Sequence, residues 1–141
     1  MAPLPPVRHI ARDLLLTQPV FAGLIQPDRI VFKQPADVTA PFVVIQVPGN
    51  NAISGDNVAW SPLVQVDGYA PASDPAADDV AWELAAAAAE VFGRARNVTS
   101  GSVTFSARVI DLLQAGPDVS RGENNPLARA LMRAELTVHN Q

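Results

Sequence analysis

The side chains of this sequence that could do chemistry are two histidines, several serines and the carboxylates, because cysteine is absent. His9 and His139 lie at opposite ends of the chain and belong to no H-x-x-x-H or H-x-E pattern, so a histidine metal site is not indicated. No serine lies in a G-x-S-x-G turn, and no glycine-rich loop ends in Lys-Ser or Lys-Thr. The lack of cysteine excludes disulfides, thiolate metal sites and thiol nucleophiles. The sequence therefore predicts no catalytic residue, no cofactor and no metal.

Asp78 and Asp79 come nearest to a pair of catalytic carboxylates. They lie at the start of a predicted helix, where successive side chains point about 100° apart, which is poor geometry for sharing a proton or a metal ion. Acidic residues in the first turn of a helix interact favourably with its dipole. We therefore interpret both residues as helix-end charges.

Charge is unevenly distributed along the 141 residues, whose net charge is −4. Residues 34–93 carry eight acidic side chains and no Lys, Arg or His, whereas the segments before and after each sum to +2. The acidic balance argues against a module that binds nucleic acid through its phosphates. An acidic middle between basic ends can produce complementary faces between copies of one subunit. Alternatively, the fold mixes the three segments into an evenly charged surface.

Periodicity and turn residues predict the elements that position these side chains. Helices are predicted over residues 7–16 and 75–92, with a short extra turn at 19–24. Strands are predicted over residues 30–33, 42–47, 61–69, 103–113 and 129–139, with flexible loops over about 48–59 and 114–126. The chain length fits a single domain, residues 1–141. The predicted fold class is α+β, a mainly antiparallel sheet of four to five strands packed against two helices, in the order α-β-β-β-α-β-β.

The two tryptophans are candidates for contacts with other molecules, because tryptophan is enriched at protein interfaces. Trp60 lies at a junction of loop and strand, which favours a partner contact. Trp82 lies on a predicted helix with a wide apolar arc, so core packing and an interface role remain equally open for it.

Several short motifs occur in a recognisable order. They are Leu14-Leu15-Leu16, Ile30-Val31-Phe32, P-F-V-V-I at 41–45, and V-Q-V-D-G-Y-A at 64–70 followed by the acidic-capped helix and a final strand. From about residue 10 to residue 138, the chain resembles the tail terminator (tail completion, head–tail joining) proteins of long-tailed bacteriophages. The motifs are structural rather than catalytic.

The resemblance implies a small α+β protein without enzymatic activity that assembles as a homo-oligomer, expected to be a hexameric ring. Such a ring caps the head-proximal end of the tail tube, stops tube polymerisation and joins the tail to the head. Its partners would be the major tail tube protein and the head connector or stopper protein. DNA would pass through the lumen without specific binding, and no membrane is involved. The expected location is the virion at the tail–head junction, after assembly in the cytoplasm of the bacterial host.

Within that interpretation, charged residues are the candidates for the subunit or lumen surface, because acidic side chains repel DNA phosphates and can pair with arginines of a neighbouring copy. They are Asp56, Asp67, Asp74, Asp78, Asp79, Glu83, Glu90, Arg108, Arg129 and Arg133. Two other functions remain open from the sequence: another neck or minor tail component, and a small cellular ligand-binding domain.

Overall fold

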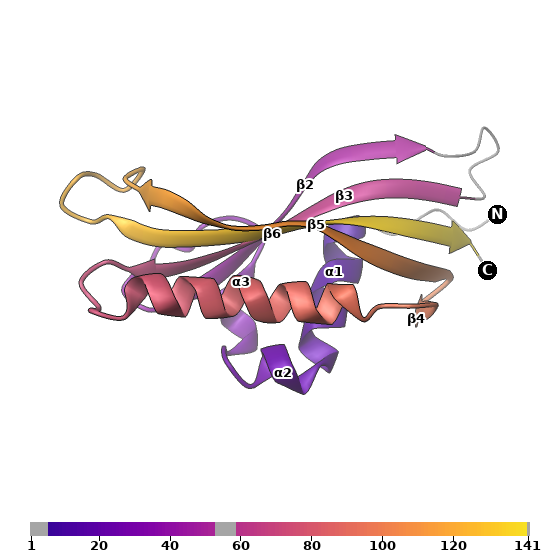
Figure 1. Ribbon diagram of the computed structural model, residues 1–141, viewed down its shortest axis with the longest axis horizontal. Helices are drawn as coiled ribbons and strands as arrows, with labels where there is room; N and C mark the ends of the chain where they lie inside the picture. Colours follow the sequence, from indigo (N-terminus) through magenta and orange to yellow (C-terminus); the bar gives the residue numbers. More distant parts are fainter. Residues whose placement is uncertain (1–5, 53–58, 141) are drawn as a thin grey trace.

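The protein is built on a curved six-stranded sheet with its helices on one face (Figure 1). The computed structural model describes residues 6–52 and 59–140. The strands, in the sheet order β1-β2-β3-β6-β5-β4, are β1 Ile30–Val31, β2 Phe42–Ala52, β3 Ala59–Pro71, β6 Leu127–Asn140, β5 Val103–Asp118 and β4 Val98–Ser100. The helices are α1 Val7–Thr17, α2 Pro19–Ala22 and α3 Ala77–Gly93, with a 3₁₀ turn, η1, at Pro27–Arg29.

The predicted α+β class is confirmed. Every strand pairing is antiparallel except the short parallel pair of β1 and β2. The sheet has one strand more than the upper prediction because β4 is only three residues long and follows α3 almost directly. The turn after Pro19 forms a separate short helix, so the structure has three α-helices rather than two.

The helices bury one face of the sheet, as the alternation of side chains requires. In β3, Val64, Val66 and Ala70 face the helices, and in β6 the residues from Ala128 to Val138 that alternate with Arg129 and Arg133 do the same. The buried stripe of α1 consists of apolar residues at helical spacing: Val7, Ile10, Ala11, Leu14 and Leu15. Apolar burial on this face is the main stabilisation of the fold.

Gly68 of β3 allows α3 to approach the sheet closely. A Cβ atom at this position would lie 2.7 Å from the carbonyl oxygen of Ala81 and 2.9 Å from Cβ of Leu84. The buried face of α3 above this point is made largely of alanines, including Ala81, Ala85 and Ala88. Small side chains on both surfaces therefore hold α3 against the centre of the sheet.

The two predicted loops are shorter than expected. Strand β2 continues through Ala52, with an irregularity between Gln46 and Gly49 that accommodates Pro48. Residues 53–58, the remainder of the first loop apart from Ala59, lie outside the described residues. Strand β5 continues to Asp118, so residues 114–118 are strand and only 119–126 connect it to β6. Long hairpin pairing overrides the turn propensity of Gly116 and Pro117, which lie at an irregularity in β5.

No helix in the described part of the chain has the length and apolar character needed to cross a membrane.

Candidate interaction site

The face of the sheet opposite the helices carries a polar cluster, in which Gln65, Asp67 and Tyr69 are buried, Arg129 is half-buried and Gln46 is exposed. The Asp67 carboxylate is fully buried and accepts hydrogen bonds from Nε2 of Gln65 at 2.8 Å, Nε2 of Gln46 at 2.9 Å and Nη2 of Arg129 at 3.1 Å. These residues meet because β3 lies between β2 and β6 in the sheet. A buried carboxylate is tolerated only when it is paired and hydrogen-bonded in this way.

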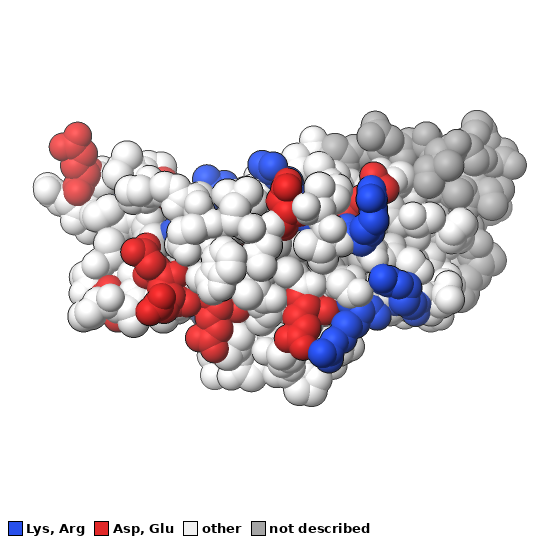
Figure 2. All heavy atoms as spheres, in the orientation of Figure 1, with Lys and Arg blue, Asp and Glu red and all other residues white. Residues whose placement is uncertain are grey.

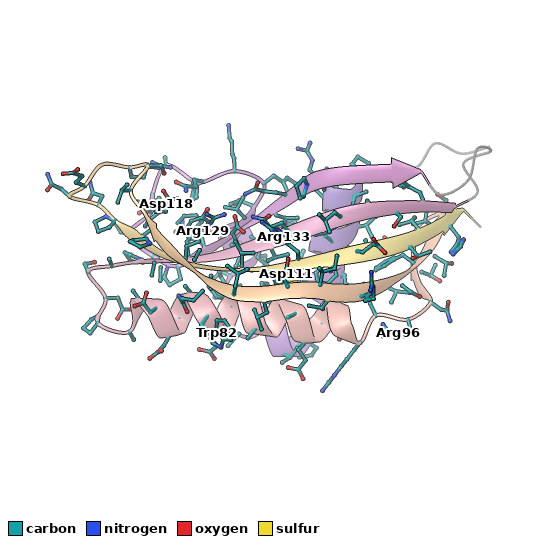
Figure 3. All side chains as sticks on the ribbon, turned by 45° about the horizontal axis from the view of Figure 1, so that its top comes forward. Trp82, Arg96, Asp111, Asp118, Arg129 and Arg133 are labelled. Atoms are coloured by element: carbon teal, nitrogen blue, oxygen red, sulfur yellow. The ribbon has the colours of Figure 1, made fainter. Side chains whose placement is uncertain are left out.

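The polar cluster continues across β6 to β5 through Arg133. Its Nε donates to Oε1 of Gln65 at 3.0 Å, and its Nη1 lies 3.4 Å from Oδ2 of Asp111 (Figure 3). An irregularity between Val109 and Asp111 shifts the alternation of β5, so Asp111 pairs with Arg133. All of these contacts, from Gln46 on β2 to Asp111 on β5, join residues of one chain.

Aromatic stacking and burial shape the environment of Tyr69, whose ring stacks on that of Phe42 with centroids 4.8 Å apart. Burial raises the pKa of the Tyr69 phenol, and the negative charge of Asp67 raises it further. The phenol is therefore held neutral. With a fully bonded carboxylate beside it, the polar cluster presents no free acid, base or nucleophile.

A glutamine ties the β5–β6 connection to the segment after β1. Nε2 of Gln34 donates to Oδ2 of Asp118 at 2.8 Å, and its Oε1 accepts from Nε of Arg121 at 3.1 Å. Burial alone would raise the pKa of the Asp118 carboxyl, but hydrogen bonds from Ser120 and Gln34 outweigh it and lower the pKa. The hairpin end is thus fastened to the rest of the chain although much of it is exposed.

The outer surface of α3 carries the clearest concentration of one charge. Asp78, Asp79, Trp82 and Glu83 are exposed there, and we call these four residues the acidic face. Figure 2 shows acidic side chains spaced along this surface and basic ones gathered beyond the carboxyl end of the helix. Trp82 has 39% of its surface exposed, so its side chain is available for contact. The sequence alone left open whether Trp82 packs in the core or lies at an interface.

A hollow beside the edge strand β1 carries mainly positive charge. It has a volume of about 620 Å³, and we call it the basic hollow: its lining includes three basic side chains, Arg8, Arg12 and Lys33, one acidic side chain, Asp28, and the Phe32 ring. The guanidinium of Arg8 lies 4.9 Å from the centre of the Phe32 ring. Arg12 donates to the carbonyl oxygens of Ile30 and Pro27 at 2.9 and 2.8 Å. Sequence reasoning missed this site, although Arg8 and Arg12 lie one helical turn apart.

The acidic candidates divide into four groups. Asp56 lies outside the described residues. Asp67 is a correction: it was expected at a subunit or lumen surface, but it has no exposed surface because Arg129 and two glutamines enclose it. Asp74 is half-buried and accepts a hydrogen bond from the Ala76 N–H at 2.9 Å, so it orders the turn before α3. Asp78, Asp79, Glu83 and Glu90 are exposed on α3, where Glu90 pairs with Arg94.

The other candidates are largely engaged within the chain. Arg129 and Arg133 are half-buried and bonded as described above, and Arg108 is exposed, 3.6 Å from Glu135 on the neighbouring strand. Trp60 is half-buried and packs against the main core, which leaves only part of its side chain for a partner.

Apolar side chains are exposed near the outer edge of β5. Ile110, Leu112 and Leu113 each have more than a third of their surface exposed. The N–H of Ala107 bonds to the carbonyl oxygen of Ala95 at 3.1 Å, but beyond it no strand among the described residues pairs with this edge. Within that same part of the chain, no three acidic or histidine side chains are placed to hold a metal ion.

Comparison with known proteins shows the fold. No model of a known protein family matches the chain, and no curated protein sequence matches it. Among solved structures, the protein is similar to a chain from the virion of a native gene transfer agent particle. The TM-score is 0.58, the sequence identity is 16%, and the match covers 92% of each chain. The two chains therefore share one fold over nearly their whole lengths.

Proposed function

We propose that this protein is a non-enzymatic structural component of a phage-type virion. The observation that carries the proposal is the fold that this chain shares with a component of a virion. The match covers 92% of both chains. The chemistry of the chain agrees with it, because the polar cluster is engaged in holding strands together. The exposed charged and apolar surfaces are suited to contacts with other proteins.

The specific role we propose is that of a tail terminator. Copies of the chain would form a ring, expected to be a hexamer, on the head-proximal end of the tail tube. The ring would stop polymerisation of the major tail tube protein and offer its other side to the head connector or stopper. This role is supported by the order of sequence motifs, together with an acidic surface on α3 and a mainly basic hollow beside the edge strand β1. Such surfaces suit a head-to-tail contact between copies, which can close into a ring.

The two rims of such a ring need contact surfaces for the tube and for the connector. The β5–β6 hairpin projects from one end of the sheet (Figure 1), where Val119 has 52% of its surface exposed. We propose this end as one of the two axial contacts. Acidic side chains facing the lumen would repel DNA phosphates, so DNA would pass without binding.

Electron microscopy of particles made without this protein tests the role. A terminator is required to end tube growth, so its loss is expected to give tubes of uncontrolled length and heads without tails. Heads without tails together with tubes of normal length would point instead to another neck component. Fully formed, infectious virions would overturn the proposal of a virion role at this junction.

A further inference from the structure

The acidic face lies on α3, over the middle of the sheet, whereas the basic hollow lies beside the edge strand β1. Helix α3 packs on β3, β6 and β5, whereas α1 packs on β2 and β3. The basic hollow includes residues of α1 and of β1, the edge strand beside β2. Figure 1 accordingly shows α3 in front and α1 behind it. Within the described residues no ion pair joins the two surfaces, and they can meet between two copies.

Among the described residues, most charges on the two surfaces have no ion-pair partner. Over residues 6–52 and 59–140, no ion pair engages Asp78, Asp79 or Glu83. The same holds in this part of the chain for Arg8 and Lys33 of the basic hollow. Arg12 bonds to two carbonyl oxygens, which position its guanidinium without neutralising it. Opposite charges left unpaired on the two surfaces favour an encounter between them.

Apolar groups lie at the centre of both charged surfaces. Trp82 stands between Asp78, Asp79 and Glu83 on successive turns of α3, with 39% of its surface exposed. The basic hollow contains the Phe32 ring, which is half-buried and is contacted by Arg8 and, edge to face, by the His9 ring at 4.9 Å between centroids. A tryptophan ring entering this hollow would meet an aromatic ring and a guanidinium, both of which pack favourably on it. Tryptophan and arginine dominate the binding energy of many interfaces.

We infer that the acidic face of one copy docks into the basic hollow of the next copy, with Trp82 entering beside Phe32 and with Asp79 and Glu83 meeting Arg8 and Lys33. The two surfaces differ, so the contact is heterologous, and each copy uses both of them. This contact would join neighbouring copies in the proposed ring, and its role in a virion rests on the proposed function. It places the exposed carboxylates of α3 between subunits rather than in the lumen.

Disulfide trapping tests the contact directly, because the chain has no cysteine of its own. The chain carrying Glu83→Cys and Arg8→Cys together is oxidised in solution and in assembled particles. A ladder of cross-linked dimers, trimers and higher species on a denaturing gel is expected, since each copy joins two neighbours. The matched control carries Glu83→Cys with Ser102→Cys, which replaces the basic-hollow position by an exposed position in the turn between β4 and β5. An equal ladder from the control, or no ladder from the test pair in either sample, overturns the inference.

Charge reversal with mixing gives a second, independent test. One variant carries Asp79→Arg and Glu83→Arg, and the other carries Arg8→Glu and Lys33→Glu. Each alone places like charges across the contact and is expected to lose self-association by at least about tenfold. An equimolar mixture restores opposite charges at every contact and is expected to associate as strongly as the unaltered chain. Ser102→Arg, in the exposed turn between β4 and β5, is the control expected to leave association unchanged.

Sedimentation velocity measures the association of each variant alone and of the mixture. Circular dichroism checks that each variant is folded. Undiminished association of the separate variants would overturn the contact, and so would a folded mixture that stays apart. These outcomes are separable from failure of the proposed function. If the test pair gives ladders but virions form normally without the protein, the contact between copies is supported and the virion role is wrong. If loss of the protein gives aberrant tails but the test pair gives no ladder, the virion role is supported and the contact is wrong.

Discussion

The carboxylate of Asp67 and the guanidinium of Arg129 lie 3.1 Å apart on neighbouring strands, on the face of the sheet that no helix covers. Asp67 is fully buried, whereas 30% of the Arg129 side chain is exposed. The pair therefore holds β3 to β6 from the side opposite the apolar core. It gives this face of the sheet a fixed polar centre.

Removing the buried carboxylate should be costly. Asp67→Ala leaves the Arg129 guanidinium and the amides of Gln46 and Gln65 without their shared acceptor. Breaking a buried ion pair from one side costs roughly 3–5 kcal/mol, and the partial exposure of Arg129 favours the lower end of that range. Chemical denaturation should show this as a lowered midpoint with an unchanged slope.

The exposed ion pair between Arg108 and Glu135 is the matched control, since it also joins neighbouring strands. Its side chains are 75% and 42% exposed. Arg108→Ala should therefore change the free energy of unfolding by less than about 1 kcal/mol. A similar loss in both variants would mean that burial does not set the importance of the Asp67–Arg129 pair.

Gly68→Ala should loosen the contact between α3 and the sheet. The added methyl group would meet the carbonyl oxygen of Ala81 at 2.7 Å, so the helix must move. Overpacking of this kind typically costs about 1–3 kcal/mol. Gly116→Ala, in β5, meets nothing within 4 Å and should be nearly neutral. Thermal unfolding followed by circular dichroism compares them, and equal stability of the two variants would contradict the close packing at Gly68.

Stability should fall at high pH through Tyr69. Its pKa is raised in the folded protein above the ordinary value of 10.0, by burial and then by the charge of Asp67. A raised pKa contributes stability that is fully present below about pH 10 and is lost as the pH rises through the folded value. The difference in stability between the unaltered chain and Tyr69→Phe should therefore shrink across that window.

The phenolate absorbance of Tyr69 gives a direct check, because the chain has only one tyrosine. Its titration midpoint in the folded protein should lie above 10.0 and should move down in a folded Asp67→Asn variant. A midpoint at or below the ordinary value would show that the ring is not buried as described.

Self-association through the acidic face should weaken as salt is added. The charges proposed to meet there lie on exposed surfaces, and salt screens exposed charges over about 8–10 Å near physiological ionic strength. Trp82→Ala should weaken association at every salt concentration, because its contribution is apolar. Light scattering in a salt series distinguishes the two effects, and association that strengthens with salt would exclude a mainly electrostatic encounter.

Much of the fold follows from periodicity in the sequence. Helix α1 has nearly its predicted bounds because its buried residues recur at helical spacing, and β3 includes the whole of the predicted strand 61–69. The prediction fails where backbone pairing overrides local propensity. Gly116 and Pro117 favour a turn but lie at an irregularity inside a long hairpin. Strand β4 is too short to show any period.

The candidate surfaces were less accessible to sequence reasoning, because exposure depends on contacts between distant segments. Asp67 looks like any other acidic residue of the middle segment, yet its neighbours on β2 and β6 bury it. The basic hollow joins residues of α1 to residues after η1, and nothing local to either segment predicts their meeting. By contrast, the exposure of Asp78, Asp79 and Glu83 follows from the helical period, since the buried alanines occupy the other side.

The unpaired outer edge of β5 limits the solubility of the unassembled protein. From Val109 to Asp118 its backbone amides and carbonyls face no neighbouring strand among the described residues, and Ile110 and Leu113 add apolar surface nearby. Edges of this kind promote irregular strand-to-strand aggregation. At high concentration, unassembled chains should therefore precipitate more readily than chains whose β5 edge is covered by a bound molecule. Solubility thus reports whether that edge is covered.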